Sequence, residues 1–152
     1  MIGGYPKLTE EDAALVDVLG PLDKNQPDQL KQFIAALKSA SFFIYPTTGD
    51  TYSMPTLEAM AFGCPPLVSD YGAVPELVAD NITGFILPVT ASGLDYATKI
   101  QALLAVPGAY NDMCRAAYAR YESTHRWDKQ CLEVVAFMKR RIAETEAQAH
   151  RT

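Results

Sequence analysis

Two short apolar runs separated by one helix-length segment constrain the fold of this chain more than any other feature. The runs cover residues 42–45 and 66–69, and each predicts a buried strand. Between them, Ser53 is a favourable N-cap, Pro55 suits the first turn of a helix, and Gly63 suits its C-terminal end. This order predicts a βαβ unit with two parallel strands, and α/β proteins bind ligands at the carboxyl ends of such strands.

The rest of the chain repeats the alternation of strands and helices. Further strands are expected at residues 16–19 and 84–87. The alternation predicts an α/β fold, here a Rossmann-like parallel sheet with flanking helices in a single domain over residues 1–152. Trp127 begins the apolar stripe of the last helix and is expected in the core. Helices are expected over residues 8–14, 27–40, 54–62, 75–79, 91–106, 108–122 and about 127–148.

The charge pattern argues against nucleic acid as a partner. The 152 residues carry a formal net charge of −5, and Lys and Arg form no stripe before the final helix, whereas binding to phosphate chains needs concentrated positive charge. The sequence shows no signal peptide and no apolar run long enough to be a transmembrane segment. A cytoplasmic location is therefore expected, with peripheral attachment to a membrane left open. The three cysteines and two histidines are too widely spaced to predict a metal site.

Asp50 and Glu58 are candidate ligand-binding residues because of their places in the predicted βαβ unit. The two carboxylates stand eight positions apart, with a turn and a helix start between them. The N-terminus of a helix presents backbone N–H groups to an anion, and carboxylate oxygens accept hydrogen bonds from hydroxyl groups. A ligand with both phosphate and many hydroxyls is a nucleotide sugar. Simpler roles stay open, since Asp50 can shape the turn through its own backbone and Glu58 can stabilise the helix dipole.

A series of short motifs follows Asp50 in a fixed order. They are Glu58, Ala59-Met60-Ala61, Gly63, Ser69-Asp70, Gly72-Ala73, Pro75-Glu76 and Thr83-Gly84. Together they resemble the C-terminal, donor-binding domain of retaining GT-B glycosyltransferases of the group 1 type. The resemblance extends from about Val16 to the end of the last helix. Two positions differ from the family pattern: Asp50 replaces a glutamate, and residues 51–54 read Thr-Tyr-Ser-Met where Gly-Phe-Gly-Leu is usual.

The resemblance implies a role for each residue of this segment. Glu58 is expected to accept hydrogen bonds from the two ribose hydroxyls of a nucleotide. Asp50 is expected to accept hydroxyls of the donor sugar and to act as the catalytic residue. The backbone N–H groups that are expected to face the diphosphate and the sugar belong to Thr51, Tyr52, Ser53 and Met54. The simpler reading of these four residues is a helix entry. The resemblance implies no metal and no cofactor beyond the nucleotide-sugar donor.

The resemblance also implies that further parts belong to a complete enzyme. GT-B enzymes have two doubly wound domains, and the chain is expected to represent an incomplete second one, because Met1-Ile2-Gly3-Gly4 is similar to the end of its first strand. In the family the last helix crosses back towards the first domain, so the resemblance also implies that part of the apolar face of this helix is uncovered here. No residue matches the phosphate-clamping Arg and Lys of the family, so little transferase activity is expected from this polypeptide alone. The alternative is a non-catalytic binding or assembly module. Its partner would be a separate chain with the acceptor domain, or a second copy.

Overall fold

The computed structural model describes residues 7–149 and divides the chain into two compact units, Met1–Ala40 and Ser41–Thr152. The strand end expected at residues 1–4 lies outside the described residues. The first unit holds two helices, α1 (Glu10–Ala13) and α2 (Pro27–Ser39). Both were expected from their start signals.

The strand expected at residues 16–19 is absent from the described structure, so this prediction was wrong. Val16 and Leu19 are instead 37% and 44% exposed. A strand is stable only when a neighbouring strand pairs with its backbone, and none of the three strands of the sheet lies within residues 7–40. The apolar run at residues 16–19 thus predicted neither a strand nor a buried segment correctly.

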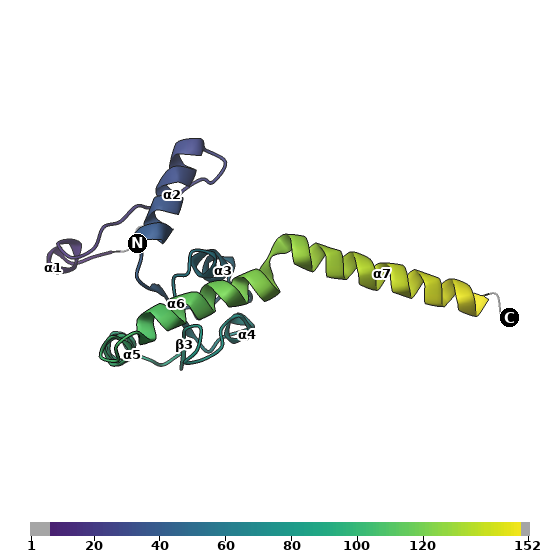
Figure 1. Cartoon of the computed structure of the whole chain (residues 1–152). Coiled ribbons are helices and arrows are strands. Elements are labelled where there is room, and N and C mark those ends of the chain that lie inside the picture. The colour runs from purple at the N-terminus through teal and green to yellow at the C-terminus, as the bar shows by residue number, and fades with distance from the viewer. Residues whose placement is uncertain (1–6, 150–152) are drawn as a thin grey trace. The chain divides into compact units, whose positions relative to one another are not determined.

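The second unit is built on a sheet of three parallel strands in the order β1-β2-β3. Figure 1 labels the last of these strands, β3, among the helices of this unit. The register of the sheet pairs Ile44 with Leu67 and Val68 with Ile86. The sheet confirms the predicted α/β fold with its parallel Rossmann-like arrangement. The strands are β1 (Phe43–Tyr45), β2 (Pro66–Ser69) and β3 (Phe85–Leu87).

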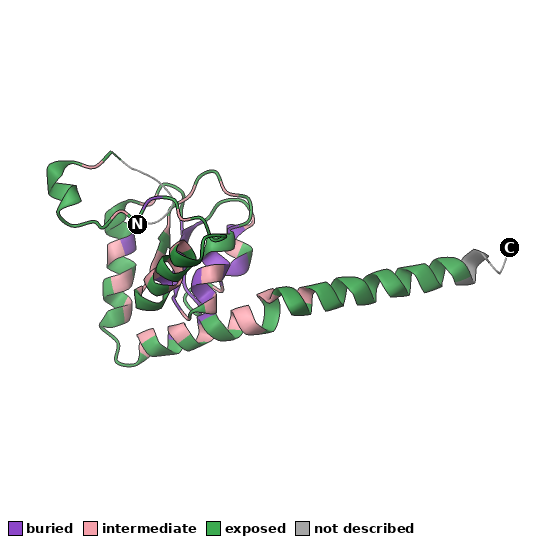
Figure 2. Ribbon diagram, turned by 90° about the horizontal axis from the view of Figure 1, so that it is seen from above, coloured by how far each residue is buried: buried purple, intermediate pink, exposed green. Residues whose placement is uncertain are grey.

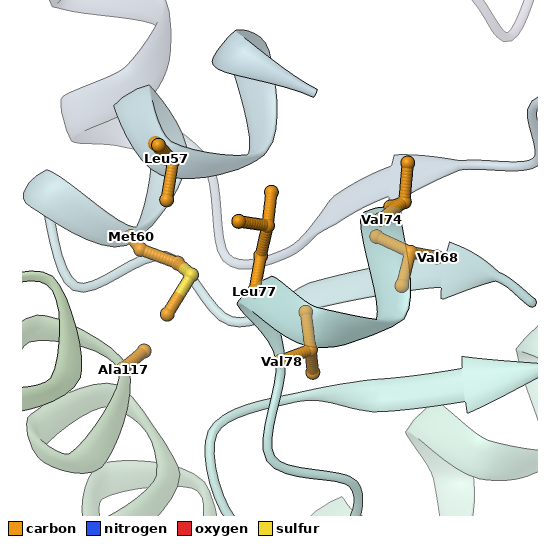
Figure 3. Packing of buried hydrophobic residues seen from close by; sticks show 7 residues of the cluster. All are labelled: Leu57, Met60, Val68, Val74, Leu77, Val78 and Ala117. Atoms are coloured by element: carbon orange, nitrogen blue, oxygen red, sulfur yellow. The ribbon is translucent and has the colours of Figure 1, made fainter. Parts of the chain in front are cut away.

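Helices cover both faces of this sheet. One face packs against α3 and α4 in a cluster of buried side chains that Figure 3 shows from close by. The opposite face packs against α5, and α6 contributes one side chain to each cluster. The helices of this unit are α3 (Met54–Ala61), α4 (Val74–Leu77), α5 (Gly93–Leu104), α6 (Ala109–Arg120), the π-helical turn η1 (Tyr121–His125) and α7 (Trp127–Ala149).

Strand β1 is only half-buried, which corrects the expectation of a buried strand. All four residues of β2 are buried, but Ile44 at the centre of β1 is 49% exposed. The difference follows from position, because β1 lies at an edge of the three-stranded sheet and β2 lies at its centre. Side chains alternate between the two faces of a strand. Tyr45 therefore packs against the cluster under α3, while Ile44 points to the other face, where α5 packs along β3.

Helix α7 begins at the residue expected for the last helix, but its apolar stripe is exposed. Trp127 is 68% exposed, so its assignment to the core was wrong. Figure 2 shows exposed residues along most of α7, which contacts η1 at its start. The other exposed apolar side chains of this stripe and its borders are Leu132, Val134, Val135, Phe137, Met138 and Ile142. None of the helices within residues 7–149 is long and apolar enough to cross a membrane.

The junction between α6 and α7 contains a histidine whose protonation is disfavoured. The Nε2 atom of His125 is buried and has no hydrogen-bond partner among the described residues. Burial, and then the positive charge of Arg120, lower the pKa of His125 below its ordinary value. An imidazolium would place a second N–H group where no acceptor receives it.

We expect His125 to make the chain less stable in mild acid. The unfolded chain binds this proton near pH 6.5 and the folded chain only at a lower pH, so stability is complete above about 6.5 and is lost as the pH falls towards the lowered value. His125→Gln removes this titration, and the dependence of the urea midpoint on pH between 7 and 5 should become shallower. An unchanged pH dependence in the variant would contradict the assignment.

Candidate functional site

The candidate site lies at the carboxyl ends of β1 and β2, where two turns meet. The first turn joins β1 to α3 and contains Asp50. The second follows β2 and contains Gly72, whose φ of 59° favours glycine. A Cβ on Gly72 would lie 2.8 Å from the Asp50 carbonyl oxygen, so only glycine allows this close approach. The Ala73 N–H donates to the Thr51 carbonyl at 3.0 Å and joins the two turns directly.

Both oxygens of the Asp50 carboxylate accept hydrogen bonds within the chain. The Tyr45 hydroxyl donates to Oδ2 at 3.0 Å, and the Tyr52 N–H donates to Oδ1 at 3.1 Å. Asp50 is half-buried. The bond from Tyr52 shows that Asp50 shapes the turn through the local backbone, as the simpler reading predicted. A carboxylate offers about four acceptor positions, so these two bonds leave others for a ligand.

Tyr45 is the residue of this site that the sequence reasoning missed. The sequence pattern identifies Tyr45 only as the last residue of a strand. Burial, and then the hydrogen bond to Asp50 and its negative charge, raise the pKa of Tyr45, while the hydroxyls of Thr47 and Ser53 act in the opposite direction. The available signal was a tyrosine at the carboxyl end of a strand, just before the turn that carries Asp50.

Several hydrogen-bonding groups at the start of α3 already bond to each other. The Ser53 hydroxyl accepts the Thr56 N–H at 3.2 Å and the Thr56 hydroxyl at 2.8 Å, and both side chains are fully buried. This confirms Ser53 as the N-cap. Pro55 has no N–H group. Among the first three helical residues, Met54 therefore supplies the N–H group that a ligand could use, and the helix end offers fewer donors than expected.

Thr51, Tyr52 and Met54 are exposed, and Tyr52 shows 46% of its surface to solvent. The predicted contacts therefore divide into two groups. Ser53 is available only through its backbone, because its side chain is the cap, whereas the three exposed residues can be approached through side chain and backbone alike. None of residues 51–54 has a positive φ, so the backbone conformation of this turn does not itself require the glycines that the family usually carries.

Glu58 is the fifth residue of α3, and it is half-buried. The helix dipole acts most strongly within the first helical turn, and Glu58 lies beyond that turn. The dipole explanation of Glu58 is therefore weak. Its neighbours Leu57 and Ala59 are 5% and 0% exposed, so packing against the sheet fixes the helix that carries it.

A cavity of about 420 Å³ lies elsewhere, beside the carboxyl end of β3 and the start of α5. Leu87, Pro88 and Lys99 are among its lining residues, whereas neither Asp50 nor Glu58 lines it. This cavity is therefore separate from the candidate site. No group of three or more His, Cys, Asp or Glu side chains within residues 7–149 could hold a metal ion.

The parallel sheet, with its ligand-type residues at the carboxyl ends of the strands, defines a Rossmann-like α/β protein. The family model described as "Glycosyl transferases group 1" matches residues 14–120, which include both turns and all of α3. The chain belongs to this family of glycosyltransferases.

Curated relatives support the family. Alpha-maltose-1-phosphate synthase of Mycobacterium tuberculosis is 39% identical over 77 residues, which cover 51% of this chain and 18% of that protein. D-inositol 3-phosphate glycosyltransferase of Streptomyces bingchenggensis is 28% identical over 92 residues, which cover 60% of this chain and 20% of that protein. The chain thus spans about one fifth of the length of these relatives.

Solved structures show the same fold. Sucrose-phosphate synthase of Thermosynechococcus elongatus superposes with a TM-score of 0.70 at 20% identity and covers 94% of this chain, which corresponds to 38% of that protein. Anabaena HepE in complex with UDP gives a TM-score of 0.60 at 20% identity and covers 90% of this chain, or 33% of that protein. The chain therefore has the fold of a part of the GT-B glycosyltransferases.

Proposed function

We propose that this chain binds the donor of a glycosyltransferase, a nucleoside-diphosphate sugar, at the turn between β1 and α3. The observation that carries the proposal is the placement of Asp50 and Glu58 at the carboxyl end of a parallel sheet, inside the segment that matches the family. Structures of Anabaena HepE contain UDP, UDP and glucose, or UDP-glucose, which supports a donor of this class.

Each part of the donor has a proposed partner in the site. Glu58 accepts the two ribose hydroxyls, since a carboxylate has two oxygens and only accepts. Asp50 accepts hydroxyls of the donor sugar. The N–H group of Met54 and the turn N–H groups of Thr51 and Ser53 face the diphosphate, where helix-end dipoles favour negative charge. The proposed reaction moves the sugar to an acceptor hydroxyl with retention of configuration, without a metal or other cofactor, in the cytoplasm.

Isothermal titration calorimetry of the purified chain against UDP, GDP and ADP tests the proposal. We expect one nucleotide to bind and Glu58→Gln to weaken it about tenfold or more, because hydrogen bonds to a charged group contribute about 1.5–3 kcal/mol each. Glu133→Gln is the matched control: it removes one carboxylate from the exposed surface of α7 and should leave the affinity unchanged. A folded chain that binds none of the three nucleotides would overturn the proposal.

The second candidate function is that of a non-catalytic binding or assembly module. The exposed apolar stripe of α7 favours it, because contiguous exposed apolar surface marks interaction sites. In both candidate functions the isolated chain does not turn over a nucleotide sugar. Sedimentation velocity separates them in part: a monomer that binds a nucleotide supports the donor site, whereas self-association without nucleotide binding supports the module.

A further inference from the structure

Asp50 is the site residue whose side chain is one methylene shorter than the family glutamate, and Tyr45 contacts it directly. Tyr45 lies on β1, where it pairs with Val68 in the sheet, and its ring packs against the cluster under α3. Its hydroxyl donates to Asp50 Oδ2 at 3.0 Å. The sheet and the core packing thus fix the position of the Tyr45 side chain, whereas Asp50 lies in a turn.

We propose that Tyr45 is a positioning residue that orients the Asp50 carboxylate towards the sugar part of the donor. The inference rests on the proposed function, since it assumes that Asp50 accepts sugar hydroxyls. A short carboxylate in a turn can rotate, and a single bond from the Tyr52 N–H would leave Oδ2 free to move. The second bond, from Tyr45, fixes the plane of the carboxylate and leaves the remaining acceptor positions of both oxygens pointing away from the two donors.

The backbone around Asp50 is already restrained, so the orientation of the side chain is what Tyr45 can control. Gly72 packs against the Asp50 carbonyl, and the Ala73 N–H donates to the Thr51 carbonyl at 3.0 Å. The Ser69 hydroxyl donates to the Thr47 carbonyl, which ties the start of the same turn to β2. With its backbone held on both sides, the turn resembles a rigid support, and an oriented carboxylate needs less reorganisation on binding.

The protonation state of Tyr45 agrees with this role. Burial and the neighbouring negative charge of Asp50 raise the pKa of Tyr45 above its ordinary value, so the hydroxyl keeps its proton at neutral pH. It therefore remains a hydrogen-bond donor to the Asp50 carboxylate at neutral pH. Removing only this hydroxyl, as in Tyr45→Phe, keeps the ring in the core and tests the hydrogen bond alone.

The experiment compares a nucleoside diphosphate with its sugar form by calorimetry, using UDP with UDP-glucose, GDP with GDP-mannose, and ADP with ADP-glucose. For the pair that the chain binds, we expect Tyr45→Phe to reduce the advantage of the sugar form about fivefold to tenfold, with the affinity for the nucleoside diphosphate unchanged. Tyr110→Phe is the matched control, because the Tyr110 hydroxyl also donates over 3.0 Å, to the Ser41 carbonyl at the amino end of β1. It should change neither affinity.

Asp50→Asn completes a double-mutant cycle. If Tyr45 acts through Asp50, the sugar form loses its advantage in Asp50→Asn, and adding Tyr45→Phe changes nothing further. The positioning role would be overturned by a sugar advantage that Tyr45→Phe leaves unchanged, by an equal loss for both ligands, or by a wild-type chain that binds the sugar form no better than the nucleoside diphosphate. In each of these cases nucleotide binding still supports the donor site. A folded wild-type chain that binds none of the six ligands would overturn the proposed function, and the positioning role with it.

Discussion

Replacing Gly84 by alanine is expected to destabilise the second unit by more than about 3 kcal/mol. A Cβ at this position would lie 2.2 Å from the carbonyl oxygen of Pro66 and 2.9 Å from two atoms of its ring. Real Cβ atoms do not approach other atoms so closely, and neither the backbone nor the ring of Pro66 can move freely, because Pro66 begins the central strand β2. The backbone of Gly84 has no positive φ, so the cost arises from this contact alone.

Gly93→Ala is the matched control for Gly84→Ala. A Cβ on Gly93, the first residue of α5, would meet no atom within 4 Å. This substitution should stabilise the chain slightly, by about 0.5 kcal/mol, since alanine loses less backbone freedom than glycine on folding. Urea unfolding followed by circular dichroism measures both changes. Similar midpoints for the two variants would show that β3 does not approach β2 as closely as described.

The close approach at Gly84 also explains why the need for a glycine at this position could not be seen in the sequence alone. The Thr83-Gly84 pair was read as part of a family motif, with no physical reason for the glycine. Residues 66 and 84 are far apart along the chain, and their contact exists only when β2 and β3 are paired in the observed register. A long-range requirement of this kind becomes visible only in the folded structure.

The parts of the fold that the sequence predicted well depend on local interactions. The start of α3 was predicted from Ser53 and Pro55, and the cap that Ser53 forms with Thr56 spans only three residues. The end of the helix near Gly63, whose φ is 69°, has an equally local cause. The alternation of such elements then predicted the parallel α/β sheet correctly.

The errors in the prediction concern residues whose environment depends on distant parts of the chain. Val16, Ile44 and Trp127 are apolar and were assigned to strands or to the core, yet all three are exposed. Periodicity shows which residues share a face of an element. It does not show whether another element covers that face.

The candidate site likewise combines residues that could be identified from the sequence with contacts that only the folded structure shows. Asp50 and Glu58 were identified from their spacing, and the structure places them on the turn and helix that were expected. The hydrogen bond from Tyr45 and the packing of Gly72 against the Asp50 carbonyl could not be predicted, because each joins separate elements in three dimensions. Whether Asp50 and Glu58 contact a donor stays a prediction for the titrations above.

Shortening Met60 to alanine should cost about 2–5 kcal/mol of unfolding free energy, the range found when a large buried side chain is removed from a core. Met60 is fully buried. Figure 3 shows it extending from α3 towards Leu77 of α4 and Ala117 of α6. Deleting its thioether leaves a cavity where these three helices meet. Because the helices are joined to the sheet through the same cluster, they cannot close the cavity without disturbing the strands.

Met138→Ala makes the same chemical change on an exposed face, since Met138 on α7 is 55% exposed. Its effect should stay within about 0.5 kcal/mol, as is usual for surface substitutions. Urea midpoints of the two variants measure the difference. Met60 also lies two residues after Glu58 on α3, so its packing maintains the helix that carries the proposed ribose acceptor. If Met60→Ala unfolded no more easily than Met138→Ala, the cluster would not hold α3 against the sheet, and the position of Glu58 would need another explanation.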